Sequence, residues 1–219
     1  MYLPRYHRLD DPRLARSLMR AQPLATWICV IDGDPVVNHI PFHLDDSRGP
    51  HGCLIGHVSR ANPVWRALTP ACRSVAVFHG PQAYVTPSWY PGKVIHGEVV
   101  PTWDYAVVHA HGPARAIEDP AWLRAMLDRL TDDQERTRPA PWQVSDAPPD
   151  YVDTLMRAIV GIEIPIERLD SKLKASQDEA PADRVGTVAG LRARNTGSDR
   201  AMADLVEQHD RPARNAPRG

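Results

Sequence analysis

Residues 80–93 read GPQAYVTPSWYPGK, and this stretch restricts the folds open to the chain. It holds three prolines, two tyrosines and one tryptophan, which is too much proline for a helix and too much aromatic surface for an ordinary loop. Rigid aromatic rings beside prolines form an apolar wall with polar tips, which suits a planar aromatic ligand. The alternative is a loop that packs its aromatic rings into the core or into a subunit interface.

Composition places the chain among globular proteins. Of its 219 residues, 42% are hydrophobic and 24% are charged, which is enough apolar material for a real core. The formal net charge of -1 gives no overall attraction to nucleic acid or to an anionic membrane. No apolar run approaches the length of a membrane span, and the first residues, MYLPRYHRLDD, lack a signal-peptide pattern. We therefore expect a cytoplasmic protein, with its three separated cysteines as buried thiols.

The pattern of apolar and turn residues predicts many strands, with helices concentrated at the two ends and after residue 117. Strands are expected at residues 24–31, 36–44, 53–58, 74–80, 82–86, 99–117 and 162–170, with Gly80-Pro81 as a tight turn. Helices are expected at residues 11–20, 63–68, 118–130, 150–161, 182–194 and 198–208. Residues 87–98 are expected to be irregular, and residues 171–177 to form a polar segment after the last strand. This order indicates an α+β protein built on a small antiparallel barrel.

Two segments carry polar side chains where a ligand could be held. Ser59, Arg60 and Asn62 precede a helix start at Pro63, and donors of this kind at a helix N-terminus favour phosphate. The alternative is simple capping by Asn62, with Arg60 facing solvent. Asn38 and His39 interrupt an otherwise apolar strand, which indicates ring contacts to the same ligand or, for the histidine, a hydrogen-bonded place in the core.

Two further segments are rich in hydrogen-bonding groups. His109 and His111 share one strand face, but no cysteine or carboxylate joins them at a metal-site spacing, so no metal is expected. Trp103 and Tyr105 also share a face and suit a ligand or an interface. A donor-rich group follows the last expected strand: Lys172, Lys174, Ser176 and Gln177. It suits a negatively charged partner, or else it is a solvated turn.

The chain resembles the PaiB family of flavin-binding negative transcriptional regulators, within the pyridoxamine phosphate oxidase-like split-barrel flavoproteins. The motifs that carry the resemblance include MYLPRYH, NHIPF, GHVSRANP, VFHGPQAYVTPSWYPGK, HGEVVPTWDYAVVHAHG and RAIVGIEIPIERLDSKLKASQ. They extend from residue 1 to about residue 191. The chain departs from the family pattern where Asp178 replaces the asparagine of KxSQN and where Ser171 replaces a glycine.

The resemblance implies an α+β fold, an FMN-binding split β-barrel of antiparallel, Greek-key-like topology with peripheral helices. It implies a homodimer with FMN at the subunit interface, a barrel domain at residues 1–178, a helical extension at 179–208 and a disordered tail at 209–219. Ser59, Arg60 and Asn62 would lie at the phosphate, and Asn38 and His39 near the ring system. The remaining cofactor residues implied are Tyr84, Ser88, Trp89, Tyr90, Lys93, Trp103, Lys174, Ser176 and Gln177.

Three functions are compatible with these features. The first is a PaiB-type regulator that binds FMN and represses transcription. The second is a flavin-dependent oxidoreductase, or an enzyme that processes haem or another small ligand. The third is a flavin-binding dimer without chemistry of its own. For the regulator, DNA contact is expected from the arginine-rich segment after Asp183, although the alternative is that its helices pack on the barrel.

Overall fold

The computed structural model describes residues 1–69 and 72–209 and divides them into two compact units. Unit 1 comprises residues 1–15, 79–108 and 171 onward, and unit 2 comprises residues 16–78 and 109–170. The expected tail, from residue 210, lies outside the described residues. Helix α1 (Pro12–Ala21) and strands β5 (Arg73–Val85), β6 (Thr102–Pro113) and β9 (Arg168–Lys174) each contribute residues to both units.

Unit 2 contains an antiparallel hairpin formed by β1 (Leu24–Ile31) and β2 (Asp34–Pro41). Asp32 and Gly33 make the two-residue turn, and both have positive φ angles, 52° and 93°. This is the geometry that matches the twist of a hairpin, and Asp-Gly is a favoured pair for it. The other edge of β1 pairs antiparallel with the first half of β5, so the hairpin is anchored in a larger sheet.

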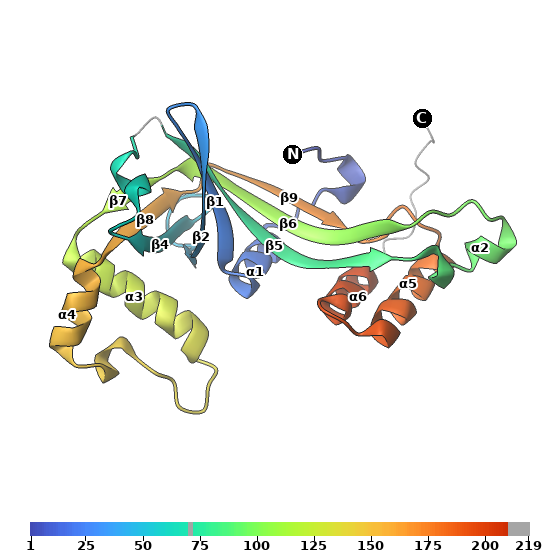
Figure 1. Ribbon diagram of the computed structural model, residues 1–219. Helices are drawn as coiled ribbons and strands as arrows, with labels where there is room; N and C mark the ends of the chain where they lie inside the picture. Colours follow the sequence, from blue (N-terminus) through green and yellow to red (C-terminus); the bar gives the residue numbers. More distant parts are fainter. Residues whose placement is uncertain (70–71, 210–219) are drawn as a thin grey trace. The chain divides into compact units, whose positions relative to one another are not determined.

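A second sheet lies wholly within unit 2, and its pairs with a described register are all antiparallel. Its strand order is β3 (His43–Asp45), β4 (Cys53–Ser59), β8 (Ile159–Pro165) and β7 (Arg115–Ile117). Helices α3 (Pro120–Glu135) and α4 (Pro149–Arg157) lie beside this sheet (Figure 1). Leu123 and Met126 of α3 pack against Cys53 and Ile55 of β4. The short helices η2 (Pro63–Arg66) and η4 (Val144–Asp146) complete the unit.

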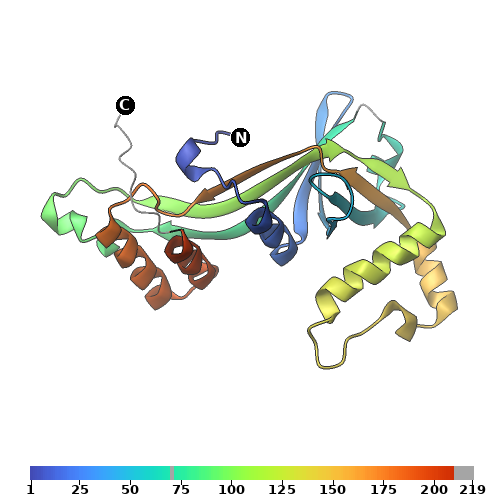
Figure 2. The same ribbon diagram turned by 180° about the vertical axis from the view of Figure 1, so that it is seen from behind.

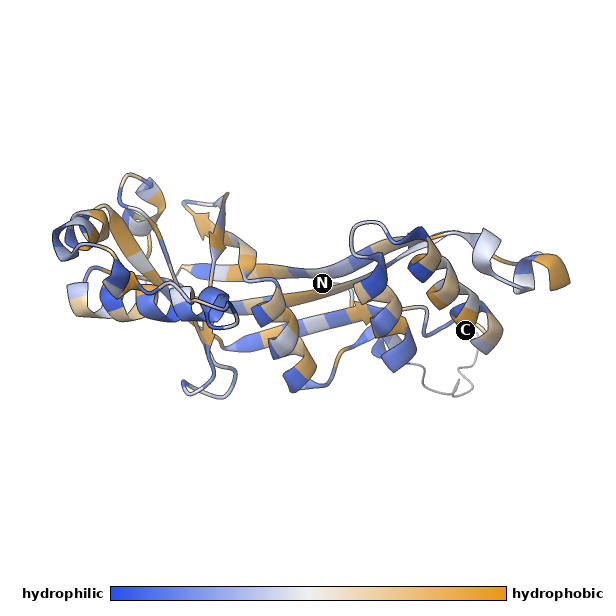
Figure 3. Ribbon diagram, turned by 90° about the horizontal axis from the view of Figure 1, so that it is seen from below, coloured by the Kyte–Doolittle hydropathy of each residue, from blue (hydrophilic) through white to orange (hydrophobic). Residues whose placement is uncertain are grey.

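Unit 1 is a sheet covered on one face by the two C-terminal helices. The second half of β5, the first half of β6 and the end of β9 form the sheet. Helices α5 (Pro181–Arg194) and α6 (Asp199–Gln208) lie side by side along the same face of β5 and β6 (Figures 1 and 2). Both helices carry apolar stripes (Figure 3), and Leu191, Met202 and Val206 are almost completely buried. These two helices therefore supply the core of the unit.

The loop after β5 is built on α5. It contains η3 (Pro87–Trp89) and one helical turn, α2 (Gly92–Ile95), where the sequence predicted irregular structure. A Cβ on Gly186 would overlap the Trp89 carbonyl oxygen, and a Cβ on Gly190 would overlap the indole ring. The glycines spaced four residues apart thus let the loop approach the helix at backbone distance. Asp183 accepts a hydrogen bond from the amide of Gly92 at 2.9 Å.

Three predictions of local structure are wrong. Gly80-Pro81 is not a turn, because β5 continues through it to Val85. Pro81 is tolerated since the pairing of β5 with β1 ends at Val77, so no β1 partner requires its missing N–H. Residues 171–174 are not a polar segment either but the end of β9, where Ser171, Lys172 and Leu173 are buried. The predicted last strand is in fact two, β8 and β9.

The α+β class is confirmed, with antiparallel pairing in every register described. The strands form a five-stranded sheet, β2-β1-β5-β6-β9, and the four-stranded sheet, rather than one closed barrel. The predicted boundary at residue 178 stays a prediction. Within the described residues, however, the C-terminal helices belong to the same compact unit as residues 79–108.

Candidate functional site

The residues predicted to bind the cofactor fall into two groups, one in each compact unit. The group in unit 2 comprises Asn38, His39, Ser59, Arg60 and Asn62. The group in unit 1 comprises Tyr84, Ser88, Trp89, Tyr90, Lys93, Trp103, Lys174, Ser176 and Gln177.

Asn38 and Asn62 are brought together by a relay of hydrogen bonds. The Val64 amide donates to Asn62 Oδ1 at 3.0 Å, and Asn62 Nδ2 donates to Asn38 Oδ1 at 2.7 Å. This relay fixes the orientation of both side-chain amides. It leaves Asn38 Nδ2 buried without a hydrogen-bond partner among the described residues. A buried donor of this kind calls for an acceptor from a ligand or a water molecule.

Arg60 is engaged by its own chain. Its guanidinium donates from Nε to the Arg157 carbonyl at 2.8 Å, from Nη2 to the Ile159 carbonyl at 3.1 Å, and from Nη1 to the Glu118 carboxylate at 2.6 Å. These contacts tie the end of β4 to the end of α4. Ser59, beside it, is exposed and accepts a hydrogen bond from the Ala61 amide. A phosphate at Arg60 would have to compete with Glu118.

Asn38 and His39 point to opposite faces of their sheet, because side chains alternate along a strand. Asn38 lies opposite the fully buried Trp27, and His39 lies opposite Thr26 and is exposed. Within one chain, one ligand face can therefore receive only one of the two side chains. The face that carries His39 is otherwise largely apolar, with Leu24, Val30 and Val37 about half or more exposed at 61%, 54% and 52%.

Trp89 and Tyr90 pack against α5 in their own chain. The Arg194 guanidinium lies 4.9 Å from the centre of the Trp89 ring. Tyr90 is buried, and this burial, with Glu179 and Asp104 nearby, raises the pKa of its hydroxyl. The contacts match the alternative in which the loop packs its aromatic rings into the core. They also give the loop a partner within the unit, so its burial does not require a second chain.

Ser88 and Lys93 lie on the exposed side of the same loop. The Lys93 ammonium donates to Ser88 Oγ at 3.3 Å, and the Ser88 amide donates to Thr86 Oγ1 at 3.2 Å. Both side chains are exposed and accessible to a ligand, and they are carried by the short helices η3 and α2.

Lys174 and Ser176 converge on Asp104, which is fully buried. Asp104 accepts from the Ser176 amide at 3.2 Å and from its hydroxyl at 2.6 Å. Burial raises the pKa of this carboxyl, and the bonds from Ser176 and the charge of Lys174 oppose the shift. The Lys174 ammonium also donates to Thr102 Oγ1 and, at 3.1 Å, to the Trp103 carbonyl. Lys174 therefore has partners within the protein.

Gln177 closes a turn on its own backbone. Its Oε1 accepts from the Ala175 amide at 2.7 Å, and its Nε2 donates to the Leu173 carbonyl at 2.6 Å. Ser176 adopts a left-handed φ of 53° in this turn. Asp178, where the family pattern has asparagine, lies 3.9 Å from buried His7, which lowers the pKa of the carboxyl.

The face of the unit 1 sheet opposite the helices is open and aromatic. Tyr84 and Trp103 meet edge to face, with ring centres 6.0 Å apart, and are 40% and 56% exposed. Tyr105 follows two residues after Trp103, on the same side of β6. Because the planes of Tyr84 and Trp103 are tilted by 67°, one of these two rings can stack on a planar ligand while the other meets its edge. Lys172 and Lys174 lie on the neighbouring strand, β9. We refer to Tyr84, Trp103, Tyr105, Lys172 and Lys174 as the open face.

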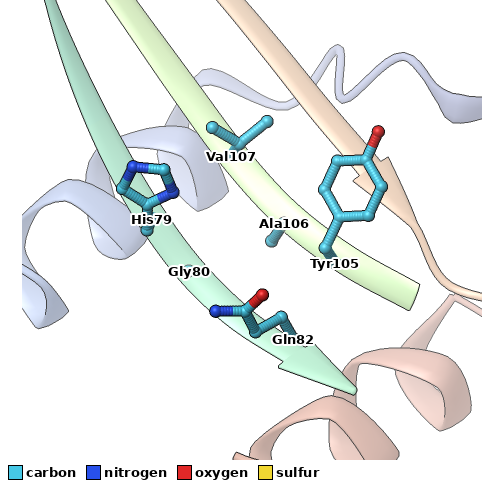
Figure 4. A pocket seen from close by; sticks show the side chains of 6 residues that line it. All are labelled: His79, Gly80, Gln82, Tyr105, Ala106 and Val107. Atoms are coloured by element: carbon cyan, nitrogen blue, oxygen red, sulfur yellow. The ribbon is translucent and has the colours of Figure 1, made fainter. Parts of the chain in front are cut away.

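A hollow of about 180 Å³ adjoins Tyr105 on this sheet. Figure 4 shows His79 and Gln82 projecting from β5 on one side, with Tyr105 on the other side reaching toward β9. Sequence reasoning missed His79 and Gln82. The signal was the one used for Asn38 and His39: both interrupt an apolar strand, here VFHGPQAYV.

Residues 1–69 and 72–209 contain no group of three or more His, Cys, Asp or Glu side chains placed to hold a metal ion. His111 instead pairs with Asp170 at 3.1 Å. None of the helices in that part of the chain is long and apolar enough to cross a membrane.

The family model described as "Putative FMN-binding domain" matches residues 1–168. The chain belongs to this family. The PaiB relationship predicted from the motifs is confirmed: the protease synthase and sporulation protein PAI 2 of Bacillus subtilis is 28% identical, and the alignment covers 94% of this chain and 97% of that protein. An uncharacterized protein of Emericella nidulans is 33% identical, with 95% and 97% covered.

The solved structures place the fold in the same class. The FAD and haem binding protein from Mycobacterium smegmatis matches with a TM-score of 0.55 at 23% identity, covering 79% of this chain and 76% of that one. This confirms the expected split-barrel flavoprotein fold. FMN is the cofactor that membership of the family assigns to the chain, as the motifs predicted.

Side chains on the open face of unit 1 and the Asn38 amide of unit 2 each fit a part of FMN. The open face offers three aromatic rings and a lysine, Lys172, whose ammonium lies between two of the unit's tyrosine rings. The buried Asn38 Nδ2 is a donor without an acceptor among the described residues. A flavin is planar, carries acceptor atoms on its rim and ends in a phosphate, so it matches these groups in kind.

Proposed function

We propose that the protein is a PaiB-type flavoprotein that binds FMN as a homodimer and uses the flavin for a redox reaction. The observation that carries this proposal is the open face of unit 1. Three aromatic rings lie on the side of the sheet that α5 and α6 leave uncovered, with Lys172 and Lys174 on the neighbouring strand β9, in a member of an FMN-binding family. When bound, FMN supplies the electron-transfer chemistry.

The chain's own residues have separate tasks in this proposal. Trp103 stacks on the ring system, and Tyr84 and Tyr105 flank it and exclude water from one face of the flavin. The Asn38 amide donates a hydrogen bond to an acceptor on the flavin. Arg60 has a structural task, because its donors are bonded within the chain. Candidates for contacts that the partner subunit completes are His39, Ser59, Asn62, Ser88, Lys93, Ser176 and Gln177.

The homodimer is supported by the sheet face that carries His39. Leu24 and Val30 of β1 and Val37 of β2 expose aliphatic side chains on this face, with the Thr26–His39 pair between Leu24 and Val37. Exposed aliphatic side chains gathered on one sheet face favour an interaction surface. A second copy of the chain, pairing about a two-fold axis, would cover it and place the flavin at the interface.

Repression of transcription is the second candidate, and it is favoured by the similarity to PAI 2. The expected source of DNA contact does not support it. Arg192 pairs with Asp204 and Glu207, and Arg194 pairs with Asp199. These carboxylates neutralise Arg192 and Arg194, so these two side chains offer little attraction for DNA phosphates. This weakens the case for the regulator, and the redox proposal stands first. We further propose a reducing, cytoplasmic setting, in which Cys29, Cys53 and Cys72 persist as the free, buried thiols seen here.

The test combines three measurements on the purified protein. Its visible spectrum is recorded before and after addition of FMN and desalting, and its mass is measured by sedimentation with flavin bound. We expect retained flavin bands and a dimer. Trp103→Ala should weaken FMN binding, whereas Trp142→Ala, an exposed tryptophan of unit 2, should not. A protein that takes up no FMN, or a flavin-loaded monomer, would contradict the proposal. Tight binding of a DNA fragment at physiological salt would move the regulator to first place.

A further inference from the structure

Lys172 is a nearly buried cation without a counter-ion. Its exposed fraction is 8%, although lysine is almost never buried unless it is paired. In residues 1–69 and 72–209, no carboxylate lies within ion-pair distance of its ammonium group. Its one hydrogen bond is long, 3.4 Å to the carbonyl oxygen of Tyr2.

Two tyrosine rings hold the ammonium in place instead. Lys172 Nζ lies 5.9 Å from the centre of the Tyr2 ring and 5.2 Å from the centre of the Tyr105 ring. Cation–π contacts of this kind offset only a small part of the cost of removing an ammonium group from water. The rings fix where the charge lies but do not neutralise it.

Three carboxylates of unit 1 are bonded to groups other than Lys172. Asp104 is bonded to Ser176, Asp178 faces His7, and Asp183 accepts from Gly92. Lys174, two residues along β9, shows the contrast: its ammonium has a hydroxyl, a carbonyl and a carboxylate as partners. Of these two lysines, only Lys172 keeps its charge available.

We infer that Lys172, with Tyr2 and Tyr105, forms a subsite for an anionic group of a ligand, a phosphate or a carboxylate. Tyr105 also lines the hollow of about 180 Å³, whose other polar side chains are His79 and Gln82. The hollow is lined by residues of β5 and β6 and adjoins the Lys172 subsite through the shared Tyr105; it has room for a small group and not for a whole flavin. Two anions fit this subsite. One is the phosphate of FMN, and in that case the inference rests on the proposed function. The other is the charged group of a second, small ligand. Tyr2 makes the N-terminal segment part of the subsite.

The test uses Lys172→Met, which keeps most of the side-chain volume and removes the charge. Arg200→Met is the matched control, since Arg200 is an exposed cation of unit 1 on α6 and is not a candidate for contact with the flavin. Three quantities are measured for each protein: the urea midpoint without ligand, the stabilisation of that midpoint by inorganic phosphate and by benzoate, and the dissociation constants of FMN and riboflavin. Benzoate and phosphate are also added to the FMN-loaded protein.

We expect Lys172→Met to raise the urea midpoint of the ligand-free protein, because an uncompensated buried charge is lost, and to abolish its response to phosphate. A loss of FMN affinity of about tenfold or more, with riboflavin unchanged, would identify the anion as the flavin phosphate. Unchanged flavin binding, together with loss of the phosphate or benzoate response of the loaded protein, would identify a separate anionic ligand.

Two results would overturn the inference. One is a Lys172→Met protein that responds to phosphate, benzoate and FMN as the wild type does. The other is a less stable variant with these responses intact, which would make Lys172 a structural clamp for the N-terminal segment. A wild-type protein that binds no flavin would refute the proposed function alone, because the phosphate and benzoate measurements on the ligand-free protein would still test Lys172.

Discussion

Arg60 has two possible roles, a structural one through its contacts within the chain and a cofactor-binding one at the phosphate. Replacing it by alanine distinguishes them. The substitution removes three side-chain donations, to the carbonyls of Arg157 and Ile159 and to the carboxylate of Glu118. The side chains of Arg60 and Glu118 are 35% and 54% exposed, so water screens the ion pair and replaces part of each bond. At about 0.5–1 kcal/mol for each contact, we expect a loss of roughly 2 kcal/mol in the free energy of unfolding.

The assay is urea denaturation of Arg60→Ala, followed by titration with FMN and with riboflavin. Arg66→Ala is the control, because Arg66 is exposed and its described contact is the Trp65 ring, 4.4 Å away. The control should lose less than about 0.5 kcal/mol. Since the Arg60 donors are already engaged, the ratio of FMN to riboflavin affinity should stay near the wild-type value. A variant of unchanged stability that loses FMN but keeps riboflavin would refute this reasoning and restore the phosphate role inferred from the motif.

Three further predictions concern unit 1. Gly190→Ala should cost about 2–4 kcal/mol of unfolding free energy in urea, because its Cβ would overlap the rigid Trp89 ring; the exposed Ala189→Ser on the same helix is the control. Deleting the chain after Leu191 should lower the melting temperature measured by circular dichroism, since it removes the buried Met202, Leu205 and Val206; an unchanged melting curve would show that α6 is dispensable. Arg194 lowers the pKa of Asp199 to about 2, so the pair stabilises the fold above the unfolded pKa near 3.8 and loses this effect as pH falls toward 2. Asp199→Asn should therefore be less stable than wild type by roughly 1–2 kcal/mol at pH 6 and equal to it below pH 2, and a constant difference across that range would contradict this assignment.

Local patterns predicted most of the secondary structure correctly. The Asp-Gly turn, the apolar strands and the capped helices depend on neighbours in sequence, and the structure has them where expected, from β1 and β2 to α5 and α6. The turn predicted at Gly80-Pro81 was wrong because local sequence does not show whether a partner strand needs the N–H of residue 81. The same limit applied to Ser171 and Lys172, whose polar character hid a buried strand.

The candidate site was predicted in its residue types more than in its contacts. The motifs identified the cofactor and named Trp103 and Tyr84, which lie on an open aromatic face. They could not show that Trp89 packs against Gly186 and Gly190, about a hundred residues away, or that Arg60 meets Glu118. Sequence spacing carries no information on which side chains compete for one partner. For the same reason, Lys172 and Lys174 looked equivalent, and only one of them has a carboxylate near its ammonium group.

The composition of unit 1 has a consequence for synthesis on the ribosome. Its pieces come from the start, the middle and the end of the chain, residues 1–15, 79–108 and 171 onward. All the residues of unit 2 precede residue 171. We therefore expect this unit to begin to fold while α5 and α6 are still in the ribosomal exit tunnel. Unit 1 has to wait, with its apolar strand segments unprotected, until α5 and α6 emerge. The contacts within unit 1 join residues that are far apart in the sequence, and contacts of this kind form slowly. During that interval the nascent chain exposes the apolar surface that α5 and α6 later cover. We expect chaperones to bind this surface.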